Sequence, residues 1–399
     1  MKSFQSPAFY EFYSPVKILS GDNALDNIPY ELSKKNSSNP LIITDEGVSK
    51  SGILKIVTKI LKSGKIKNNV IFDKTPRDSS LEVVQELAAV FKKNKCDCII
   101  AIGGGSVIDT AKGVRILVTN RTNNLKSLSG VNRINPSSVA LFILPTTSGT
   151  GSEATQVAVI SDNQKGEKML FVSPYIYPDM AVLDPRLTVT LPPKLTAMTG
   201  MDALTHAVEA YTCTQKNPVS DAFASTAVKM VFSNLMSAVK NGSNKKARME
   251  LANASLLAGI AFSNSMVGAV HSIGHACGAV AHIPHGHAMS VILPEIMKYN
   301  FKKSSALYGE LLLYAAGAEV YAATPEKERG TKLIGFINTM KSELEKKCGL
   351  SMLLPSDIFD AKMIKSVAEY AINDGSMLNN PLEMTVAQVE KVLKNCVAK

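Results

Sequence analysis

One uncharged segment constrains the fold more than any other part of the chain. Residues 251–294 contain no Asp, Glu, Lys or Arg, yet they hold five of the six histidines. So long a segment without charge is expected inside a protein, where an unpaired polar group costs several kcal/mol. These imidazoles therefore need partners, and a metal ion would satisfy several at once. The five are His271, His275, His282, His285 and His287.

Length and composition indicate a soluble globular protein of two or three domains. The chain has 399 residues and a net charge of +10, but its basic residues form short scattered runs without interleaved aromatics. Such runs are typical of solvated faces, so nucleic-acid binding is not expected. The N-terminus lacks the apolar core of a signal peptide, which predicts a cytoplasmic location. Residues 251–270 have the length of a membrane span, but polar residues and glycine interrupt them, which favours a buried helix and no membrane association.

Short apolar runs separated by helical patterns characterise the first half of the chain. Continuous apolar strands alternating with helices are what a parallel sheet covered on both faces requires. We therefore predict an α/β domain over residues 1–190. The runs are residues 41–44, 70–72, 98–102 and 139–144.

After residue 190 the pattern changes to apolar residues at helical spacing, with few β-branched clusters. This spacing predicts an all-helical domain over residues 191–399. The predicted helices cover residues 195–211, 220–239, 248–262, 266–281, 307–316, 332–347 and 386–397.

A glycine run, residues 103–106, lies between the third apolar run and the helix that follows it. Backbone N–H groups at such a helix start can hold a phosphate, and glycine lets the backbone approach it. Because position 108 is Ile, the run is not the usual G-x-G-x-x-G fingerprint. A tight strand-to-helix turn with no ligand is the alternative interpretation.

Two further features favour a dinucleotide. Asp45 ends the first strand, where a carboxylate can bind a ribose hydroxyl and repel the 2′-phosphate of NADP, although it can also simply cap the next helix. Residues 145–153, rich in hydroxyls and glycine, follow the fourth strand. Ligands bind beyond the strand ends of open α/β sheets, so we expect this loop to contact phosphate or ribose.

The second half offers the ligands of a metal site. Asp202 and His206 are four residues apart on a predicted helix and so share one face, and His271 and His275 repeat that spacing. His285 lies in a predicted Pro-His-Gly-His loop that can complete a tetrahedron. Three imidazoles and one carboxylate suit Fe²⁺ or Zn²⁺ better than Mg²⁺ or Ca²⁺.

The remaining histidines are expected to have other roles. His282 and His287 are predicted to lie outside the ligand set. His275, one helical turn from a predicted ligand, can either support the ligands from behind or carry a proton.

With these residues assembled, the chain resembles the iron-containing (group III) alcohol dehydrogenase family. The resemblance covers nearly the whole chain, because Asp45 and several longer motifs occur together in the family's order. The motifs are GGGSVIDTAK (103–112), PTTSGTGSEAT (145–155), MDALTHAVEAY (201–211) and the histidine segment 271–287.

The resemblance implies an α/β dinucleotide-binding domain with a parallel sheet and an all-α metal-binding domain, the dehydroquinate-synthase-like fold. It implies that Asp202, His206, His271 and His285 bind the metal. His275 is our own candidate for the proton carrier. The resemblance also implies a set of NAD contacts. These are Asp45, Gly104, Gly105, Ser106, Asp109, Thr146, Thr147, Thr155, Lys168 and Leu187. Asp78 stands where the family often has an asparagine on the adenosine side, which puts that contact in doubt.

The sequence therefore predicts an NAD-dependent, iron-containing enzyme that transfers a hydride between a small primary alcohol, aldehyde or diol and NAD(H). Zn²⁺ is an alternative to Fe²⁺, and we expect a homodimer or larger homo-oligomer. One rival is a non-redox metal enzyme of the dehydroquinate-synthase type, whose sugar-phosphate substrate calls for Lys or Arg that residues 251–294 lack. The other rival is a metal- or nucleotide-binding protein without catalysis.

Overall fold

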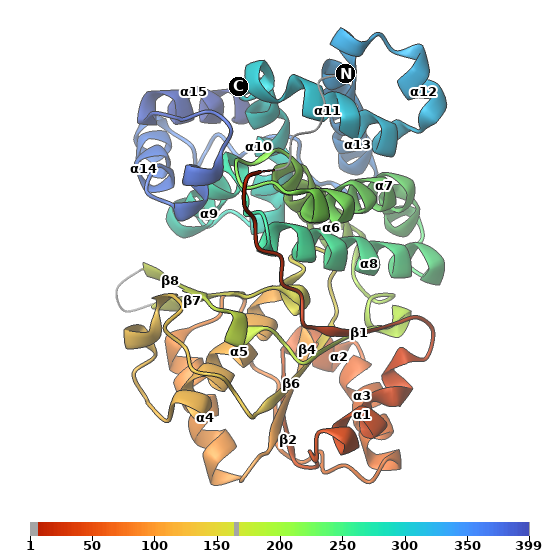
Figure 1. Cartoon of the computed structure of the whole chain (residues 1–399), viewed down its shortest axis with the longest axis vertical. Helices are drawn as coiled ribbons and strands as arrows, with labels where there is room; N and C mark the ends of the chain where they lie inside the picture. Colours follow the sequence, from red (N-terminus) through yellow and green to blue (C-terminus); the bar gives the residue numbers. More distant parts are fainter. Residues whose placement is uncertain (1–6, 163–166, 399) are drawn as a thin grey trace. The chain divides into compact units, whose positions relative to one another are not determined.

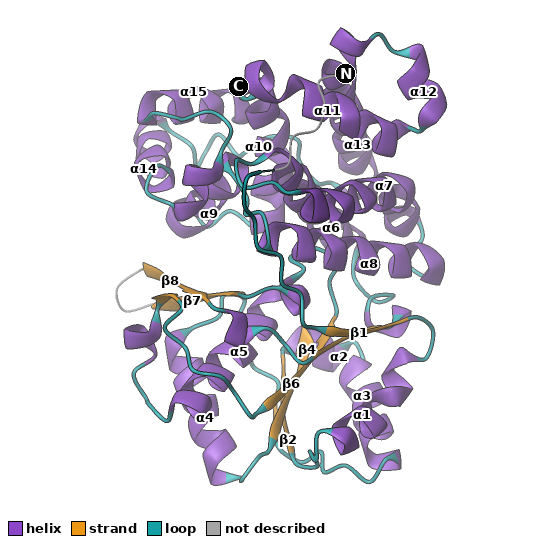
Figure 2. Cartoon of the chain, viewed as in Figure 1, coloured by secondary structure: helices purple, strands orange, loops and turns teal. Residues whose placement is uncertain are grey.

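Strands and helices separate along the chain in the computed structural model, which describes residues 7–162 and 167–398. Its contacts form two units, residues 13–191 and residues 192–398 together with 7–12. Figure 2 shows the named strands, in orange, within the first unit. The second unit, as far as it is described, is built from helices and loops.

The first unit contains a six-stranded parallel sheet with the strand order β1-β9-β6-β4-β2-β3. Its strands are β1 Lys17–Ser20, β2 Pro40–Thr44, β3 Ile71–Phe72, β4 Cys98–Gly103, β6 Ala140–Pro145 and β9 Met180–Leu183. The four predicted apolar runs are strands here, and the sheet confirms the predicted fold class. A smaller sheet has the order β5-β8-β7, with β5 Gly130–Val131, β7 Val157–Asp162 and β8 Glu167–Val172.

Alternate side chains of the central strands enter two separate apolar clusters. In β2, Leu41 and Ile43 belong to the cluster beneath α4 (Leu81–Lys93) and α5 (Gly105–Asn120). Ile42 belongs to the cluster formed with α1 (Ile28–Lys34), α2 (Glu46–Lys50) and α3 (Ile53–Ser63). Because successive side chains of a strand point to opposite faces, a sheet covered on both faces needs continuous apolar strands.

Fifteen α-helices are described in the chain, and the second unit holds ten of them (Figure 1). They are α6 Pro193–Thr212, α7 Pro218–Lys240, α8 Lys245–Ser263, α9 Ala269–Ala281, α10 His285–Tyr299, α11 Phe301–Ala316, α12 Ala318–Ala323, α13 Arg329–Cys348, α14 Ala361–Ala371 and α15 Val386–Cys396. Short 3₁₀ turns lie in both units. They are η1 Ala24–Asn27, η2 Leu125–Leu128, η3 Ser152–Ala154, η4 Pro174–Ile176, η5 Pro185–Leu187, η6 Glu326–Glu328 and η7 Gly375–Asn379.

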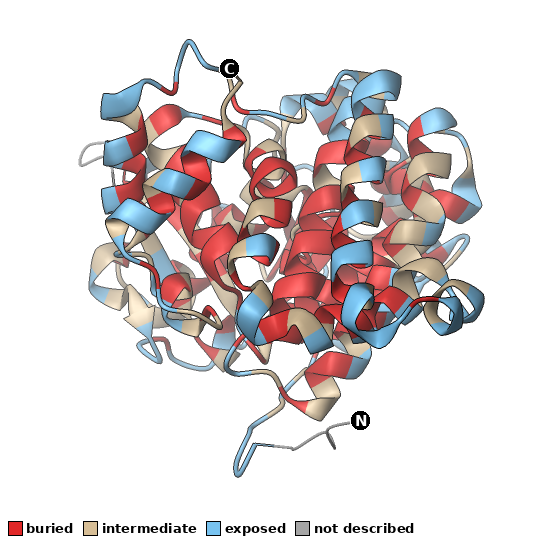
Figure 3. Ribbon diagram, turned by 90° about the horizontal axis from the view of Figure 1, so that it is seen from above, coloured by how far each residue is buried: buried red, intermediate tan, exposed pale blue. Residues whose placement is uncertain are grey.

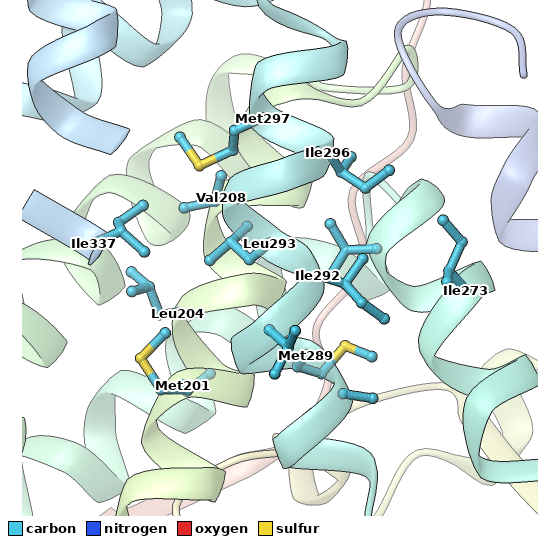
Figure 4. Close-up of a cluster of buried hydrophobic side chains, with 14 of the residues drawn as sticks. Met201, Leu204, Val208, Ile273, Met289, Ile292, Leu293, Ile296, Met297 and Ile337 are labelled. Atoms are coloured by element: carbon cyan, nitrogen blue, oxygen red, sulfur yellow. The ribbon is translucent and has the colours of Figure 1, made fainter. Parts of the chain in front are cut away.

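One apolar core holds the helical unit together. Figure 4 shows side chains of α6, α9, α10 and α13 within this core, among them Leu204, Ile273, Leu293 and Ile337. Buried residues, red in Figure 3, run along the helices, while exposed residues lie on their outer turns. The segment 251–270 is divided between two buried helices, because α8 ends at Ser263 and α9 begins at Ala269, in agreement with the separate helices predicted over residues 248–262 and 266–281.

Among the described residues, α7 is long and apolar enough to cross a membrane by length and composition. Several of its apolar side chains, including Val228, Val231 and Leu235, are fully buried in the core of the helical unit. Its apolar character is therefore that of a core helix.

Two of the differences from the sequence predictions concern His285 and residues 7–12. His285 does not lie in a loop, because α10 begins at His285 directly after Pro284. Residues 7–12, which the predicted boundary assigned to the α/β domain, group with the helical unit. There Phe12 stacks on Phe223, with ring centroids 5.7 Å apart, so an aromatic contact holds this segment.

Candidate functional site

Helix α6 presents two of the predicted ligands on one buried face. Pro193 starts this helix, where its missing N–H costs nothing, and the helix continues without a break to Thr212. Asp202 and His206 lie one turn apart and are 2% and 5% exposed. Charge so deeply buried requires a partner, and the nearest groups are imidazoles.

Three histidine rings converge on one oxygen of Asp202. Its Oδ1 lies 3.3 Å from His285 Nε2, 3.7 Å from His206 Nδ1 and 3.9 Å from His271 Nε2. Potential ligand atoms of Asp202, His271 and His285 all lie within 4.8 Å of one another. The His206 ring contacts two other rings. Its centroid lies 4.3 Å from that of His271 and 4.4 Å from that of Phe262, on which it stacks.

These converging atoms fit a metal ion. Asp202 Oδ1, His206 Nδ1 and His271 Nε2 are all buried and make no hydrogen bond. Buried polar atoms are rarely left unpaired, and each such atom costs about 1–3 kcal/mol. One carboxylate oxygen with three imidazole nitrogens is a donor set suited to a divalent transition ion. The residues present thus fit the metal that the sequence predicted.

The protonation states also suit metal binding. Burial lowers the pKa of His206 to about 3 and lowers the pKa of His271 well below its usual 6.5. Burial alone would raise the pKa of Asp202, but the surrounding histidines hold that pKa well below its ordinary value. The carboxylate is therefore ionised and these two rings are neutral at pH 7, which is the form in which both bind metals.

Glu209, which was not among the predicted site residues, contacts His271 on the side of the ring away from Asp202. Its Oε2 lies 2.6 Å from His271 Nδ1, and its Oε1 accepts a 2.7 Å hydrogen bond from the Val270 backbone N–H. Glu209 is 5% exposed, and burial raises its pKa to about 7. A sequence signal existed, because Asp202, His206 and Glu209 follow i, i+4, i+7 spacing along one helix face.

His275 also has a carboxylate partner that the sequence analysis did not identify. Its Nδ1 lies 2.9 Å from Asp374 Oδ2, while Asp374 Oδ1 accepts a 2.8 Å bond from the Ser376 backbone N–H. The His275 ring stacks on that of His285, with centroids 5.5 Å apart, and its side chain is 32% exposed. With Asp374 fixing Nδ1, the other ring nitrogen is free for a second role.

The remaining two histidines stand apart from this group. His282 is exposed and caps the end of α9 in a left-handed conformation, with φ 54°. His287 is half-buried in the first turn of α10, and burial lowers its pKa. Neither belongs to the group of convergent ligand atoms found among the described residues.

In the first unit, the predicted cofactor motifs meet at one edge of the large sheet. Because β2, β4, β6 and β9 are parallel, the residues that follow them emerge at the same edge. A Cβ at Gly104 would lie 3.1 Å from Thr147 Oγ1, and one at Gly105 would lie 2.9 Å from Thr150 Cγ2. Thr146 N donates to Gly103 O at 3.1 Å, so the glycine turn and the hydroxyl loop are in contact.

The glycine turn leads directly into a helix that can bind an anion. Gly104 precedes α5 and no side chain caps this helix start. Its first backbone N–H groups are therefore available to a phosphate, assisted by the helix dipole. The Ser106 hydroxyl donates to the Arg77 carbonyl, which fixes the first turn of α5 to the segment before α4.

Asp45 sits at the end of β2 and caps α2, since its Oδ1 accepts a 2.9 Å bond from Val48 N. Asp45 therefore has the helix-capping role that was the alternative prediction, and this role uses one of its two carboxylate oxygens. The exposed Asp78 and Lys168 of β8 form a long ion pair of 3.9 Å. Two of the predicted cofactor contacts therefore neighbour each other.

Lys112, for which no role was predicted, fixes the hydroxyl loop through hydrogen bonds. Its buried Nζ donates to Ser152 Oγ, to both oxygens of Thr155 and to Val157 O at 2.7–3.0 Å. Asp109 adds to these contacts by accepting bonds from Ser152 Oγ and Val159 N, and burial raises its pKa. The side chains of Thr155 and Leu187, predicted as cofactor contacts, are each 1% exposed and point into the protein.

Comparison with known proteins assigns both units to one family. The iron-containing alcohol dehydrogenase profile matches residues 15–185, and the profile of the Fe-containing alcohol dehydrogenase family C-terminal region matches residues 196–397. Alcohol dehydrogenase 4 of Saccharomyces cerevisiae is 33% identical, covering 96% of this chain and 97% of its own. The NAD-dependent methanol dehydrogenase of Bacillus methanolicus is 34% identical, covering 97% and 99%.

A solved 1,3-propanediol oxidoreductase has the same fold, with a TM-score of 0.92 and 31% identity over 97% of this chain and 100% of its own. These relatives carry names of redox enzymes acting on alcohols, which agrees with the main prediction and not with its two rivals. The chain therefore belongs to the iron-containing (group III) alcohol dehydrogenase family and is an NAD-linked oxidoreductase of alcohols and aldehydes.

Proposed function

We propose that the chain interconverts small primary alcohols or diols with their aldehydes, with Fe²⁺ held by Asp202, His206, His271 and His285. The observation that carries the proposal is the convergence of three imidazole nitrogens on Asp202 Oδ1, where the buried donor atoms of three of these residues make no hydrogen bond. The donor set accommodates Zn²⁺ as well, and the family's name supports iron.

NAD would bind along the sheet edge that carries the glycine turn and the hydroxyl loop. Gly104, Gly105 and Ser106 would hold the pyrophosphate at the start of α5, with Thr146 and Thr147 beside it. Asp45 favours NAD over NADP, because a second negative charge at the ribose would face its carboxylate. The predicted contacts of Asp78, Asp109 and Lys168 belong to the same proposal, and those of Thr155 and Leu187 belong to it through backbone atoms, because both side chains are buried.

A bound metal ion would supply Lewis acidity toward the substrate oxygen, and NAD the hydride acceptor. The oxidation removes a hydride from the carbinol carbon and a proton from the hydroxyl group. His275 is our candidate for accepting that proton, because Asp374 holds its Nδ1 and leaves Nε2 as the acceptor. Residues 251–294 themselves contribute no charged side chain that would compete for the reacting oxygen.

Two of the relatives have names that support small substrates, one a methanol dehydrogenase and the other a 1,3-propanediol oxidoreductase. The cytoplasmic location and a homodimer or larger homo-oligomer are further parts of the proposal, based on the sequence. Light scattering on the purified protein checks the oligomer, and cell fractionation checks the location.

The test uses full-length protein loaded anaerobically with Fe²⁺ and mixed with NADH and a panel of short aldehydes. We expect loss of absorbance of the reduced nicotinamide, and we expect His271→Ala and His285→Ala to lose both bound metal and turnover. His282→Asn is the matched control, because this exposed histidine caps α9 away from the ligand group and asparagine tolerates its left-handed backbone. A metal-free variant that keeps full activity would refute the proposal.

A further inference from the structure

Glu209 stands out among the buried groups without an assigned role. Every hydrogen bond described for its carboxylate involves an N–H or ring nitrogen at the start of α9. Among the described residues, its one side-chain partner is the neutral His271 ring, and no Lys or Arg pairs with it. A buried carboxylate without a permanent cation is costly unless its surroundings supply positive charge.

The contact with Glu209 determines which ring nitrogen of His271 carries the proton. When the carboxylate accepts a hydrogen bond from Nδ1–H, His271 is held in the tautomer whose lone pair lies on Nε2. That nitrogen is the one 3.9 Å from Asp202 Oδ1, and it has no hydrogen-bond partner. Histidines that bind metals are commonly oriented by a carboxylate in this way.

The same carboxylate also fixes the backbone beneath His271. Oε1 accepts from Val270 N at 2.7 Å, and Oε2 accepts from His271 N at 3.4 Å. Asn380 Oδ1 accepts from the next free donor, Ala269 N, at 3.3 Å. The start of α9 is therefore tied to α6, the helix that carries Asp202 and His206.

Charge balance points to the same role. Asp202 and Glu209 are two buried carboxylates within a group of neutral rings, and a divalent cation would neutralise both. Glu209 contacts His271 Nδ1 and not the Nε2 atom that lies near Asp202, so its carboxylate is behind the ring and not among the convergent atoms. Its contribution would reach the ion through the imidazole that it polarises.

We propose that Glu209 is a positioning residue of the metal site, which fixes the His271 tautomer and supplies the second negative charge that balances a divalent ion. This inference rests on the proposed metal site. Removing such a partner commonly weakens metal binding roughly 10- to 100-fold.

The experiment measures Zn²⁺ and Co²⁺ affinity of the metal-depleted full-length protein by competition with a chromophoric chelator. Glu209→Gln keeps the size of the side chain and an acceptor for the α9 backbone, but removes the charge. We expect its dissociation constants to rise roughly 10- to 100-fold, with partial rescue in Glu209→Asp. Asp221→Asn is the matched control, since Asp221 is a buried carboxylate of α7 that pairs with Lys216 instead.

Hydrogen exchange at the Val270 and His271 amides separates positioning from a purely structural role. If Glu209→Gln retains amide protection while metal affinity falls, the carboxylate acts through His271. If the variant binds both metals as tightly as the unchanged protein, or loses affinity only together with the protection of α9, the inference is wrong. Failure of the unchanged protein to bind either metal would instead refute the proposed metal site.

Discussion

At the scale of single residues, burial decides the chemical state of the charged side chains. Lys341 of α13 is 7% exposed, and its Nζ has a single long hydrogen bond of 3.4 Å to Val291 O. Burial lowers its pKa from 10.5 to about 8. Among the described residues, no carboxylate forms an ion pair with this ammonium group.

Lys341→Met should therefore stabilise the helical unit at neutral pH. The unfolded state holds this proton up to pH 10.5 and the folded state only up to about pH 8. Between those two pH values the unfolded state binds more protons than the folded state. The free energy of unfolding of the unchanged protein therefore rises with pH over this range. We expect the variant to be more stable by about 1–3 kcal/mol at pH 7, with the difference shrinking toward pH 10.5.

Urea unfolding followed by circular dichroism at several pH values measures this difference. Lys298→Met serves as the control, because Lys298 lies on the surface of α10 beside Glu295. If Lys341→Met changes stability by the same amount at every pH, the lowered pKa of Lys341 is not the cause.

At the scale of elements, close helix packing positions the ligands. Gly286, beside His285 in the first turn of α10, lies against the backbone of α6. A Cβ there would stand 2.5 Å from the carbonyl oxygen of Met198. Because a backbone atom cannot rotate away, glycine is needed for this approach.

Gly286→Ala should push the start of α10 away from α6 and move His285 from Asp202. We expect a loss of about 1–3 kcal/mol in stability and weaker metal binding, measured by thermal unfolding and chelator competition. Gly335→Ala is the matched control on α13, where a Cβ meets nothing within 4 Å. Equal effects of the two substitutions would show that helix packing at Gly286 does not position the ligand.

At the scale of the whole molecule, the residues predicted to bind NAD and those predicted to bind the metal belong to different units. The α/β unit carries the cofactor edge and the helical unit carries the histidine cluster. A ligand that binds only the folded form of a unit stabilises that unit, by about 2.7 kcal/mol at a concentration 100 times its dissociation constant.

Hydrogen exchange should therefore show separate protection by the two ligands. NAD is expected to slow exchange at residues 103–106 and 145–151, and this protection should persist when a chelator removes the metal. Metal addition is expected to protect the start of α9 and α10. The assignment of the cofactor edge fails if NAD leaves the backbone of residues 103–106 unprotected.

The sequence by itself determined the classes of the units and the spacing of residues within each element. Strand residues alternate between two faces and helix residues recur every three to four positions, so β2 and the pair Asp202 and His206 were predictable from local pattern. The Pro-His-Gly sequence at 284–286 was wrongly interpreted as a loop. A proline just before a helix and a glycine in its first turn are also compatible with the helix that forms.

Only the tertiary structure decided which side chains meet. Glu209 and His271 are 62 positions apart, and His275 and Asp374 are 99 apart. Local spacing carries no information on such pairs, because they depend on how α6, α9 and the 3₁₀ turn at residues 375–379 pack. The same packing brings His206, His271 and His285 together at Asp202 and leaves His282 and His287 apart, although four of these five histidines lie in one uncharged segment. The sequence thus supplied the candidate ligands, and tertiary packing selected among them, since convergence is a property of folded helices and not of their order along the chain.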